Sequence, residues 1–201
     1  MLKPLTLSEV AAPTAGRVIG SDSRFDGVSI DSRAIQPGQL FVALTGPRFD
    51  GHDYLNEVAA KGAVAALVER EVADAGLPQL VVADTRLALG QLGALNRAAF
   101  NGPVAAITGS SGKTSVKEML ASILRSAHGQ NAVLATRGNL NNDLGAPLTL
   151  LELSTSHRSA VIELGASRPG DIAYTVDLVR PDVSVIPNAG TAHVGEFGGP
   201  D

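Results

Sequence analysis

A short apolar run, Val104-Ala105-Ala106-Ile107, leads directly into the glycine-rich segment Thr108-Gly109-Ser110-Ser111-Gly112-Lys113-Thr114. Such a run is typical of a strand that is buried on both faces of a parallel sheet. Glycines allow backbone N–H groups to approach an anion closely, and a helix that follows directs its N-terminal N–H groups at the same anion. Lys113 adds a positive charge, and the Thr114 hydroxyl is suited to bind Mg²⁺. The segment therefore predicts a loop that binds the phosphates of a nucleotide.

The loop departs from the general phosphate-loop pattern at one position. That pattern has a glycine five residues before the Gly of the Gly-Lys pair, where this chain has Ile107, and the first glycine here is Gly109. A glycine-rich turn without a ligand is the alternative interpretation. We favour the phosphate loop because the strand, the glycines, the Lys, the Thr and the helix all fall in register.

The second half of the chain continues with alternating strand and helix patterns. Such alternation implies a parallel sheet with helical crossovers, as in α/β proteins. Strands are expected at residues 104–107, 133–136, 159–164 and 183–186, and helices at residues 113–127 and 171–179. The last residues, Gly198-Gly199-Pro200-Asp201, have a loop composition, so we expect the sheet of this domain to be incomplete within the chain.

The first half has a less regular pattern. Thr6 and Glu9 form an expected capping box for a helix that ends near Ala12. Because Asn101-Gly102-Pro103 separates the two patterns, we predict a small mixed α/β domain at residues 1–100. A phosphate-loop domain with a mainly parallel sheet then covers residues 101–201. In the first domain we expect strands at 27–33 and 40–44 with a turn at Pro37-Gly38 between them, strands at 64–68 and 80–82, and helices at 54–61 and 85–100.

Composition narrows the class of protein further. Apolar residues make up 44% of the 201 residues and charged residues 18%, which is typical of a globular protein. The formal net charge is −4 without clustered Lys or Arg, so we expect no nucleic-acid partner. The chain has no Cys, no signal-peptide pattern at its start, and no apolar run of the roughly 20 residues that span a bilayer. We expect a cytoplasmic monomer without membrane insertion.

Polar residues follow two of the strands expected in the second half. Glu163 lies near the end of one strand, and the carboxyl edge of a parallel sheet is where ligands bind in open α/β folds. Glu163 is therefore a candidate Mg²⁺ ligand, and a solvated strand end is the alternative. Asn188 and His193 follow another strand, and a neutral imidazole there can bind metal or contact phosphate. A loop His is also commonly an ordinary surface residue.

Two polar turns are candidate substrate sites. Gly138-Asn139-Leu140-Asn141-Asn142-Asp143 offers amide groups that can bind phosphate or carboxylate without adding charge, unless it is simply an Asn-rich turn. Ser29-Ile30-Asp31-Ser32-Arg33 combines hydroxyls, a carboxylate and a guanidinium. Arg33 can pair with a diphosphate and the hydroxyls with ribose or base edges, whereas the alternative is a Ser/Asp turn with a solvated Arg.

Taken together, these motifs resemble those of the Mur ligase family along essentially the whole chain. The segment 108–114 is similar to the shortened ATP loop of that family, which accounts for the departure at Ile107. Glu163 matches the family's Mg²⁺ carboxylate, and Asn188 with His193 matches its Asn-x-x-x-x-His motif. The resemblance to its uridine-nucleotide domain rests on Asp31-Ser32-Arg33, Pro37-Gly38-Gln39-Leu40-Phe41-Val42-Ala43-Leu44, Gly46 and Asp50-Gly51-His52.

Two stretches resemble one branch of the family. They are residues 136–150, around the Asn-rich turn, and Ala192-His193-Val194-Gly195-Glu196-Phe197-Gly198. That branch uses ATP and Mg²⁺ to join D-alanyl-D-alanine to UDP-MurNAc-tripeptide in peptidoglycan precursor synthesis, through an acyl phosphate. The resemblance also implies a C-terminal domain for the amine substrate and a carbamylated Lys for a second Mg²⁺. Because both lie outside this chain, we expect the chain alone to be inactive.

The resemblance assigns roles to individual residues. It implies catalytic roles for Lys113, Glu163 and His193, and Mg²⁺ binding by Thr114, Glu163 and His193. The implied ATP contacts are Gly109, Ser110, Ser111, Gly112, Lys113, Thr114, Ser115 and Asn188. The implied substrate contacts are Ser29, Asp31, Ser32, Arg33, Asn139, Asn141 and Asn142.

Four other interpretations stay open at this point. A relative that adds a single amino acid is disfavoured by the Asn-rich turn, and a folylpolyglutamate synthetase is disfavoured by the first domain. A phosphate-loop kinase would phosphorylate a stable acceptor and need no amine. A non-catalytic nucleotide-binding module would bind nucleotide through Lys113 but would have no turnover.

Overall fold

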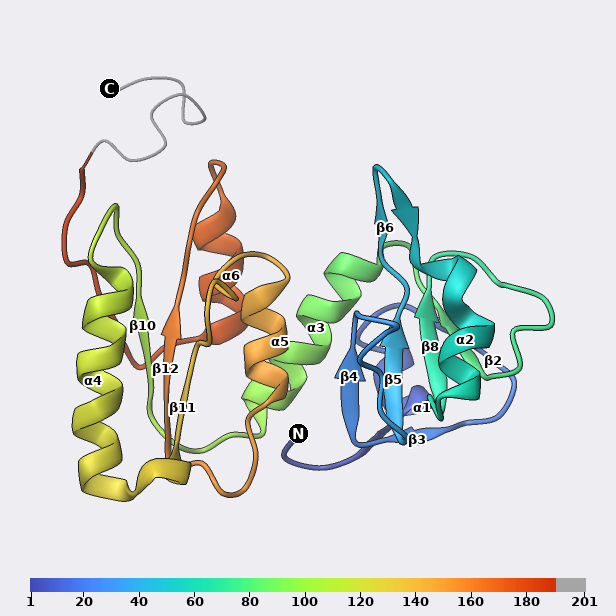
Figure 1. Ribbon diagram of the computed structural model, residues 1–201, viewed down its shortest axis with the longest axis horizontal. Coiled ribbons are helices and arrows are strands. Elements are labelled where there is room, and N and C mark those ends of the chain that lie inside the picture. The colour runs from blue at the N-terminus through green and yellow to red at the C-terminus, as the bar shows by residue number, and fades with distance from the viewer. Residues whose placement is uncertain (191–201) are drawn as a thin grey trace. The chain divides into compact units, whose positions relative to one another are not determined.

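Helix α3 (Thr85–Ala98) contributes residues to both of the compact units into which the chain divides (Figure 1). The computed structural model describes residues 1–190. One unit comprises Met1 and Lys3–Leu92, and the other comprises Leu2 and the chain from Gly93 onward. The division therefore falls inside a helix, whereas the sequence placed a domain boundary at Asn101-Gly102-Pro103.

The two halves of α3 explain where this division falls. At its start, the Thr85 N–H and hydroxyl both donate to Glu69 Oε1 in the first unit, at 3.1 and 3.0 Å. Near its end, Asn96 Nδ2 donates to the carbonyl oxygens of Leu150 and Leu153 in the second unit. The turn-forming Asn101-Gly102-Pro103 sequence follows the end of α3. The side chains of α3, however, change from contacts in the first unit to contacts in the second unit before the helix ends.

The first unit is built on a five-stranded sheet in the order β2-β9-β8-β5-β4. Only β2 runs antiparallel to its neighbour. The strands are β2 (Arg17–Ile19), β9 (Gln79–Val81), β8 (Ala65–Val68), β5 (Gln39–Val42) and β4 (Gly27–Ser29). The remaining elements are β1 (Leu5–Thr6), β3 (Arg24–Phe25), β6 (Thr45–Gly46), β7 (Phe49–Asp50), the helices α1 (Leu7–Ala11) and α2 (Leu55–Ala60), and the 3-10 helix η1 (Gly51–Tyr54).

Successive side chains of the central strands are buried on opposite faces of this sheet. Phe41 and Ala66 pack with Leu55 and Val58 of α2 on one face of the sheet. Residues that alternate with them, such as Leu40, are also fully buried, so the central strands are covered on both faces. The predicted capping box is confirmed, because the Thr6 side chain accepts from Glu9 N–H and the Glu9 side chain accepts from Thr6 N–H.

The connection between β4 and β5 differs from the prediction. The strand expected at 27–33 ends at Ser29, because Ser29 and Asp31 form a side-chain turn in which Asp31 N–H donates to Ser29 Oγ at 3.2 Å. The two strands are also parallel, so the chain must return to the opposite end of the sheet between them. Pro37-Gly38 therefore leads into β5 and does not close a hairpin.

A buried histidine joins two loops of the first unit. The side chain of His52 is 1% exposed, with Nδ1 2.6 Å from Asp50 Oδ1, and its Nε2 accepts from Glu69 N–H at 3.0 Å. Because Nε2 is the acceptor, Nδ1 carries the ring proton and donates a hydrogen bond to Asp50 Oδ1. The backbone N–H of His52 and the Arg70 guanidinium hold the pKa of Asp50 well below its usual range. Asp50-Gly51-His52 thus has a structural role in this unit.

The second unit contains a four-stranded, fully parallel sheet in the order β11-β12-β10-β13. Helix α4 covers one face, and α5 and α6 cover the other (Figure 1). The strands are β10 (Val104–Ile107), β11 (Val133–Ala135), β12 (Ser159–Glu163) and β13 (Val183–Val185). The helices are α4 (Lys113–His128), η2 (Gln130–Ala132), α5 (Gly145–Leu151) and α6 (Asp171–Val179).

Most elements of this unit agree with the sequence prediction. The exceptions are the short η2 and helix α5. Its first turn contains Gly145 and Pro147, which are usually read as loop residues. Pro is tolerated in the first turn of a helix because the N–H that it lacks would have no partner within the helix. Asn142 Oδ1 accepts from Gly145 N–H at 2.8 Å and supports the start of the helix. In the first unit, β2 and the short strands β1, β3, β6 and β7 were also not predicted.

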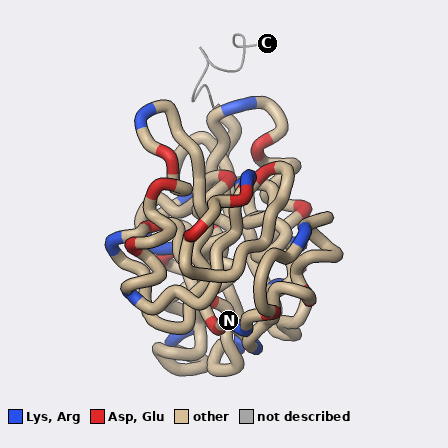
Figure 2. The backbone as a smooth tube through the Cα atoms, turned by 90° about the vertical axis from the view of Figure 1, so that its right-hand side faces the viewer, with Lys and Arg blue, Asp and Glu red and all other residues tan. Residues whose placement is uncertain are grey.

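Charged residues of both signs are interspersed along the chain in Figure 2. Several form ion pairs between close neighbours, for example Lys3 with Glu9 and Lys61 with Glu57. Within residues 1–190, no helix is both long enough and apolar enough to cross a membrane.

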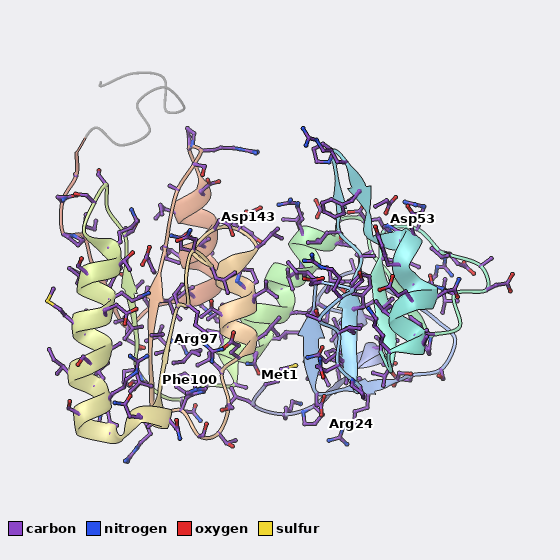
Figure 3. The ribbon with its side chains drawn as sticks, viewed as in Figure 1. Met1, Arg24, Asp53, Arg97, Phe100 and Asp143 are labelled. Atoms are coloured by element: carbon purple, nitrogen blue, oxygen red, sulfur yellow. The ribbon has the colours of Figure 1, made fainter. Side chains whose placement is uncertain are left out.

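A buried guanidinium joins three segments of the second unit at the end of α3. Arg97 lies close to Phe100 (Figure 3) and donates to its carbonyl oxygen at 3.1 Å. It also donates to the carbonyl oxygens of Val179 and Arg180, at 2.7 and 2.8 Å. The carboxylate of Asp182 lies 3.4 Å away and also accepts from the N–H of Val104, the first residue of β10. Arg97 thus donates to the buried carbonyl oxygens of Phe100 and Val179 and to the partly buried one of Arg180.

We expect Arg97→Met to lower the free energy of unfolding of the second unit by about 2–4 kcal/mol, because several buried carbonyl groups lose their donor. Urea unfolding followed by circular dichroism measures this change. Arg168→Met is the matched control, because Arg168 lies exposed in the same unit. Equal stability of the two variants would contradict the structural role of Arg97.

Candidate active site

The glycine-rich segment connects the carboxyl end of β10 to the first turn of α4, as predicted. Gly112 precedes the helix with a φ of +78°, and among the described residues no side chain caps this helix start. The N–H groups of the first turn, which includes Lys113, Thr114 and Ser115, are therefore suited to bind an anion. The positive end of the 16-residue helix α4 adds to this preference.

Gly109 is required by a close approach of two backbones. Its φ is +140°, and a Cβ atom at this position would lie 2.8 Å from the carbonyl oxygen of Asn188. Any side chain would push the loop away from the segment after β13.

The segment after β13 is hydrogen-bonded to the loop. Ser111 N–H donates to Asn188 Oδ1 at 3.0 Å, and Asn188 Nδ2 donates to Ser111 Oγ at 2.7 Å. Ser110 Oγ accepts from Gly190 N–H and donates to the Gly190 carbonyl oxygen, at 2.7 and 2.8 Å. The ammonium group of Lys113 donates to the Gly109 carbonyl oxygen at 2.6 Å. The structure thus brings Asn188 to the loop, while His193 lies outside the described residues.

Glu163 ends β12 on the face of the sheet that α4 covers, and its side chain is 3% exposed. Its Oε2 accepts from the Thr114 hydroxyl at 3.0 Å, and its Oε1 accepts from Asn141 Nδ2 at 2.9 Å. Its own N–H donates to Thr136 Oγ1 at 2.9 Å. The alternative of a solvated strand end is therefore wrong, because the carboxylate is buried and held by two side-chain donors beside the phosphate loop.

The Asn-rich turn divides between two environments. Asn141 contacts Glu163 through its side chain, and its carbonyl oxygen accepts from Gly165 N–H at 2.7 Å. Asn142 uses its Oδ1 to accept from the N–H groups of Leu144 and Gly145 at the start of α5. Asn139 is exposed in the turn before them. Only Asn141 of the three touches the cluster around Glu163 in the described chain.

The candidate residues of the first unit form a local turn after β4. Arg33 donates to Asp31 through Nε and Nη2, at 2.9 and 2.7 Å, so the ion pair is bidentate. Ser29 Oγ donates to the Asp31 carbonyl oxygen, and Lys61 Nζ donates to the Ser32 carbonyl oxygen. The side chain and backbone N–H groups of Arg33 lower the pKa of Asp31 to about 2. The turn thus presents an oriented guanidinium at the carboxyl edge of the first sheet.

One residue of the cluster around Glu163 was not predicted from the sequence. Lys117 is buried, and its Nζ lies 4.0 Å from Glu163 Oε2 and 2.8 Å from the carbonyl oxygen of Thr136. The sequence signal was available, because Lys117 follows Lys113 by one helical turn and residues four apart lie on the same side of a helix.

An oxygen-preferring cation fits this set of residues. Within the described chain, no group of three or more His, Cys, Asp and Glu residues could hold a metal ion by itself. Mg²⁺ commonly binds through one or two carboxylates together with substrate phosphates and water. The Thr114 hydroxyl and the Glu163 carboxylate, 3.0 Å apart beside the start of α4, offer oxygen atoms of the kind that such a cation binds.

Comparison with known protein families agrees with this geometry. Residues 24–97 match the model described as Mur ligase family, catalytic domain, and residues 107–201 match the model described as Mur ligase middle domain. The chain is 50% identical, over 194 residues, to the UDP-N-acetylmuramoyl-tripeptide–D-alanyl-D-alanine ligase of Escherichia coli, and this match covers 96% of the chain and 42% of that relative. The chain thus spans about two fifths of the length of such curated relatives.

Solved structures show the same likeness. A crystal structure of MurF from Acinetobacter baumannii superposes with a TM-score of 0.90 at 50% identity, covering 98% of this chain and 44% of that one. A MurF ligase from Thermotoga maritima in complex with ADP superposes with a TM-score of 0.75 at 37% identity, covering 84% of this chain and 38% of that one.

We expect Arg33→Gln to raise the pKa of Asp31 from about 2 toward the ordinary value of 3.8, because the guanidinium that stabilises the carboxylate is removed. The rise should stay incomplete, since the backbone N–H of residue 33 still donates to Asp31. A ¹³C NMR titration of the Asp31 carboxyl carbon measures the change. Lys61→Gln removes a weaker cationic neighbour and serves as the control, and an unchanged pKa in Arg33→Gln would contradict the assignment of the cause.

Proposed function

Because the chain belongs to the Mur ligase family, we propose that it forms the first two domains of an ATP-dependent amide ligase. We propose that the full-length enzyme joins D-alanyl-D-alanine to UDP-MurNAc-tripeptide, as the names of its relatives state for those proteins. The domain at residues 1–100 would bind the uridine nucleotide and the domain from residue 101 onward would bind ATP. A further domain would bind the amine substrate.

One observation carries this proposal. The buried carboxylate of Glu163 is held between the Thr114 hydroxyl of the phosphate loop and the Asn141 amide of the Asn-rich turn. This contact joins the element proposed to bind ATP and the element proposed to bind the acceptor carboxylate. A reaction that brings two anionic groups together needs these elements side by side.

The loop residues have distinct proposed roles. Lys113, the loop N–H groups and the start of α4 would bind the β- and γ-phosphates, with Ser110, Ser111 and Ser115 nearby. Lys113 Nζ donates to the Gly109 carbonyl oxygen and Ser111 N–H donates to Asn188 Oδ1, so we propose that both donors change partner when phosphate binds. Thr114 and Glu163 would bind Mg²⁺, which neutralises phosphate charge when it is bound. His193 is proposed as a further ligand in the metal–phosphate region.

The chemistry proceeds in two displacements. An oxygen of the tripeptide's terminal carboxylate attacks the γ-phosphorus, the bond to the bridging oxygen breaks, and ADP leaves with that bonding pair. The amine nitrogen of D-alanyl-D-alanine then attacks the carbonyl carbon of the acyl phosphate, phosphate leaves, and the nitrogen loses a proton. Asn139, Asn141 and Asn142 would align the carboxylate, and positive charge on Lys113 would offset the charge that accumulates in the first displacement.

The turn after β4 is proposed to hold the UDP end of the substrate. The bidentate pair with Asp31 fixes the orientation of the Arg33 guanidinium, which lowers the entropy lost when it binds a diphosphate. Ser29 and Ser32 would contact the ribose or the base.

The reaction is tested by incubating the full-length protein with ATP, Mg²⁺ and UDP-MurNAc-tripeptide, with and without D-alanyl-D-alanine. We expect phosphate release that depends on both substrates, together with a pentapeptide product detected by mass. Turnover with a single amino acid instead would indicate a family member that adds one amino acid. Phosphorylation without an amine would indicate a kinase.

We expect Lys113→Ala to reduce pentapeptide formation at least about 100-fold, because the γ-phosphoryl group loses its main positive contact from a side chain. Lys3→Ala, at an exposed Lys of the first unit, should keep the rate of the unchanged protein. Equal rates for Lys113→Ala and Lys3→Ala would remove the basis of the ATP-site assignment. Nucleotide binding without any turnover in the unchanged protein would favour a non-catalytic module.

A further inference from the structure

Lys117 occupies a core position of α4 that an apolar residue would ordinarily fill. Together with Ala121 it faces the sheet, and its side chain is 2% exposed. Val116, Leu120 and the buried strand residues of the same cluster surround this face. Moving an ammonium group into such a position costs several kcal/mol, and well-packed apolar replacements of buried ion pairs are commonly neutral or stabilising. Packing alone therefore does not explain a Lys here.

The contacts of Lys117 converge on the carboxyl ends of two strands. Its Nζ donates to the Thr136 carbonyl oxygen at 2.8 Å, directly after β11, and lies 4.0 Å from Glu163 Oε2 at the end of β12. Glu118 Oε1, which is on the exposed side of the helix, lies 3.0 Å from the same nitrogen. The ammonium group is thus compensated by one backbone acceptor and two carboxylates.

Thr136 is itself hydrogen-bonded to β12 by two contacts. Its hydroxyl accepts from Glu163 N–H at 2.9 Å, and its own N–H donates to the Val161 carbonyl oxygen at 3.1 Å. It is also the residue at which the chain leaves β11 and enters the turn that carries Asn141. Fixing the carbonyl group of Thr136 therefore fixes both the backbone of Glu163 and the starting point of the Asn-rich turn.

We propose that Lys117 is a positioning residue that holds Glu163 and the Asn-rich turn in the arrangement that binds Mg²⁺–nucleotide. This inference rests on the proposed function of the site. Lys117 lies on the buried face of α4 and acts through its hydrogen bond to Thr136 and through its charge beside Glu163 Oε2. Lys113, in contrast, is proposed to contact the phosphate directly. Supporting groups that orient metal ligands typically change metal affinity or activity about 10- to 100-fold when they are replaced.

The test measures ADP binding by calorimetry to the full-length protein, with Mg²⁺ and with EDTA. Lys117→Met gives an unbranched side chain of similar volume that is one atom shorter, and it removes the charge and the hydrogen-bond donor. We expect the gain in ADP affinity that Mg²⁺ provides to fall about tenfold or to vanish, while ADP affinity in EDTA stays within about twofold. Because the buried Glu163 carboxylate loses its neighbouring cation, we expect the melting temperature to fall, and it is measured in parallel to show that the variant is folded at the temperature of the titration. An unchanged Mg²⁺ effect in folded Lys117→Met would overturn the proposal.

Two further variants make the test specific. Lys117→Gln keeps an N–H donor directed toward Thr136, one bond shorter than the ammonium group, but lacks the charge, so we expect it to fold and to show a smaller loss of the Mg²⁺ effect. Glu118→Gln removes the other carboxylate beside Lys117 and leaves Glu163 in place, so its Mg²⁺ effect should match that of the unchanged protein. If neither Lys117→Met nor Lys117→Gln folds, Lys117 is needed only for stability and the proposal is wrong.

A double-mutant cycle with Glu163→Gln separates action through Glu163 from a general effect on the fold. We expect Lys117→Met to cost little additional Mg²⁺-dependent affinity once Glu163 is Gln, because neighbours in one network are not additive. Additive losses would contradict the proposal. ADP binding does not require the ligase reaction. If the unchanged protein binds ADP but forms no pentapeptide, the proposed function is wrong, whereas the role of Lys117 is still decided by the Mg²⁺ dependence of ADP binding.

Discussion

The organisation of the second unit depends on how one buried carboxylate is satisfied. Glu163 lies at the end of a strand whose five residues are all buried, and a carboxylate in such a place needs donors that water would otherwise supply. Thr114 of α4 and Asn141 of the turn after β11 donate hydrogen bonds to it, and the ammonium group of Lys117, 4.0 Å away, balances its charge. Because all strands of the sheet are parallel, their carboxyl ends meet at one edge, and this brings the end of β12, the start of α4 and the turn after β11 together.

Much of the fold could be predicted from sequence because the signals are local. The run from Val104 to Ile107 and the helix 171–179 have the bounds that their apolar patterns predicted, and the capping box of Thr6 and Glu9 depends on residues three apart. The phosphate loop was predictable for the same reason, since strand, glycines, Lys and helix follow one another along the chain. Residue roles taken from the family resemblance remain predictions.

What could not be predicted depends on contacts between distant residues. Parallel pairing of β4 and β5 is invisible in a pattern that fits a hairpin equally well, and the early end of β4 depends on side-chain bonds of Ser29 and Asp31. Helix α5 was not predicted because Gly145 and Pro147 usually indicate a loop. In the first turn of a helix, where the structure has them, both residues are tolerated. Lys117 reads as one polar residue on an amphipathic helix until the strand ends that it contacts are known.

The contact between Gly109 and Asn188 also constrains how the chain can change over evolutionary time. Two segments nearly eighty positions apart touch through backbone atoms, and residues 111 and 188 exchange two hydrogen bonds at a sequence separation of 77. A substitution in either segment is tolerated only if the other still fits against it. We therefore expect inherited variation in these two segments to be correlated, so that the pair is conserved or replaced together across descendants of the same ancestral gene.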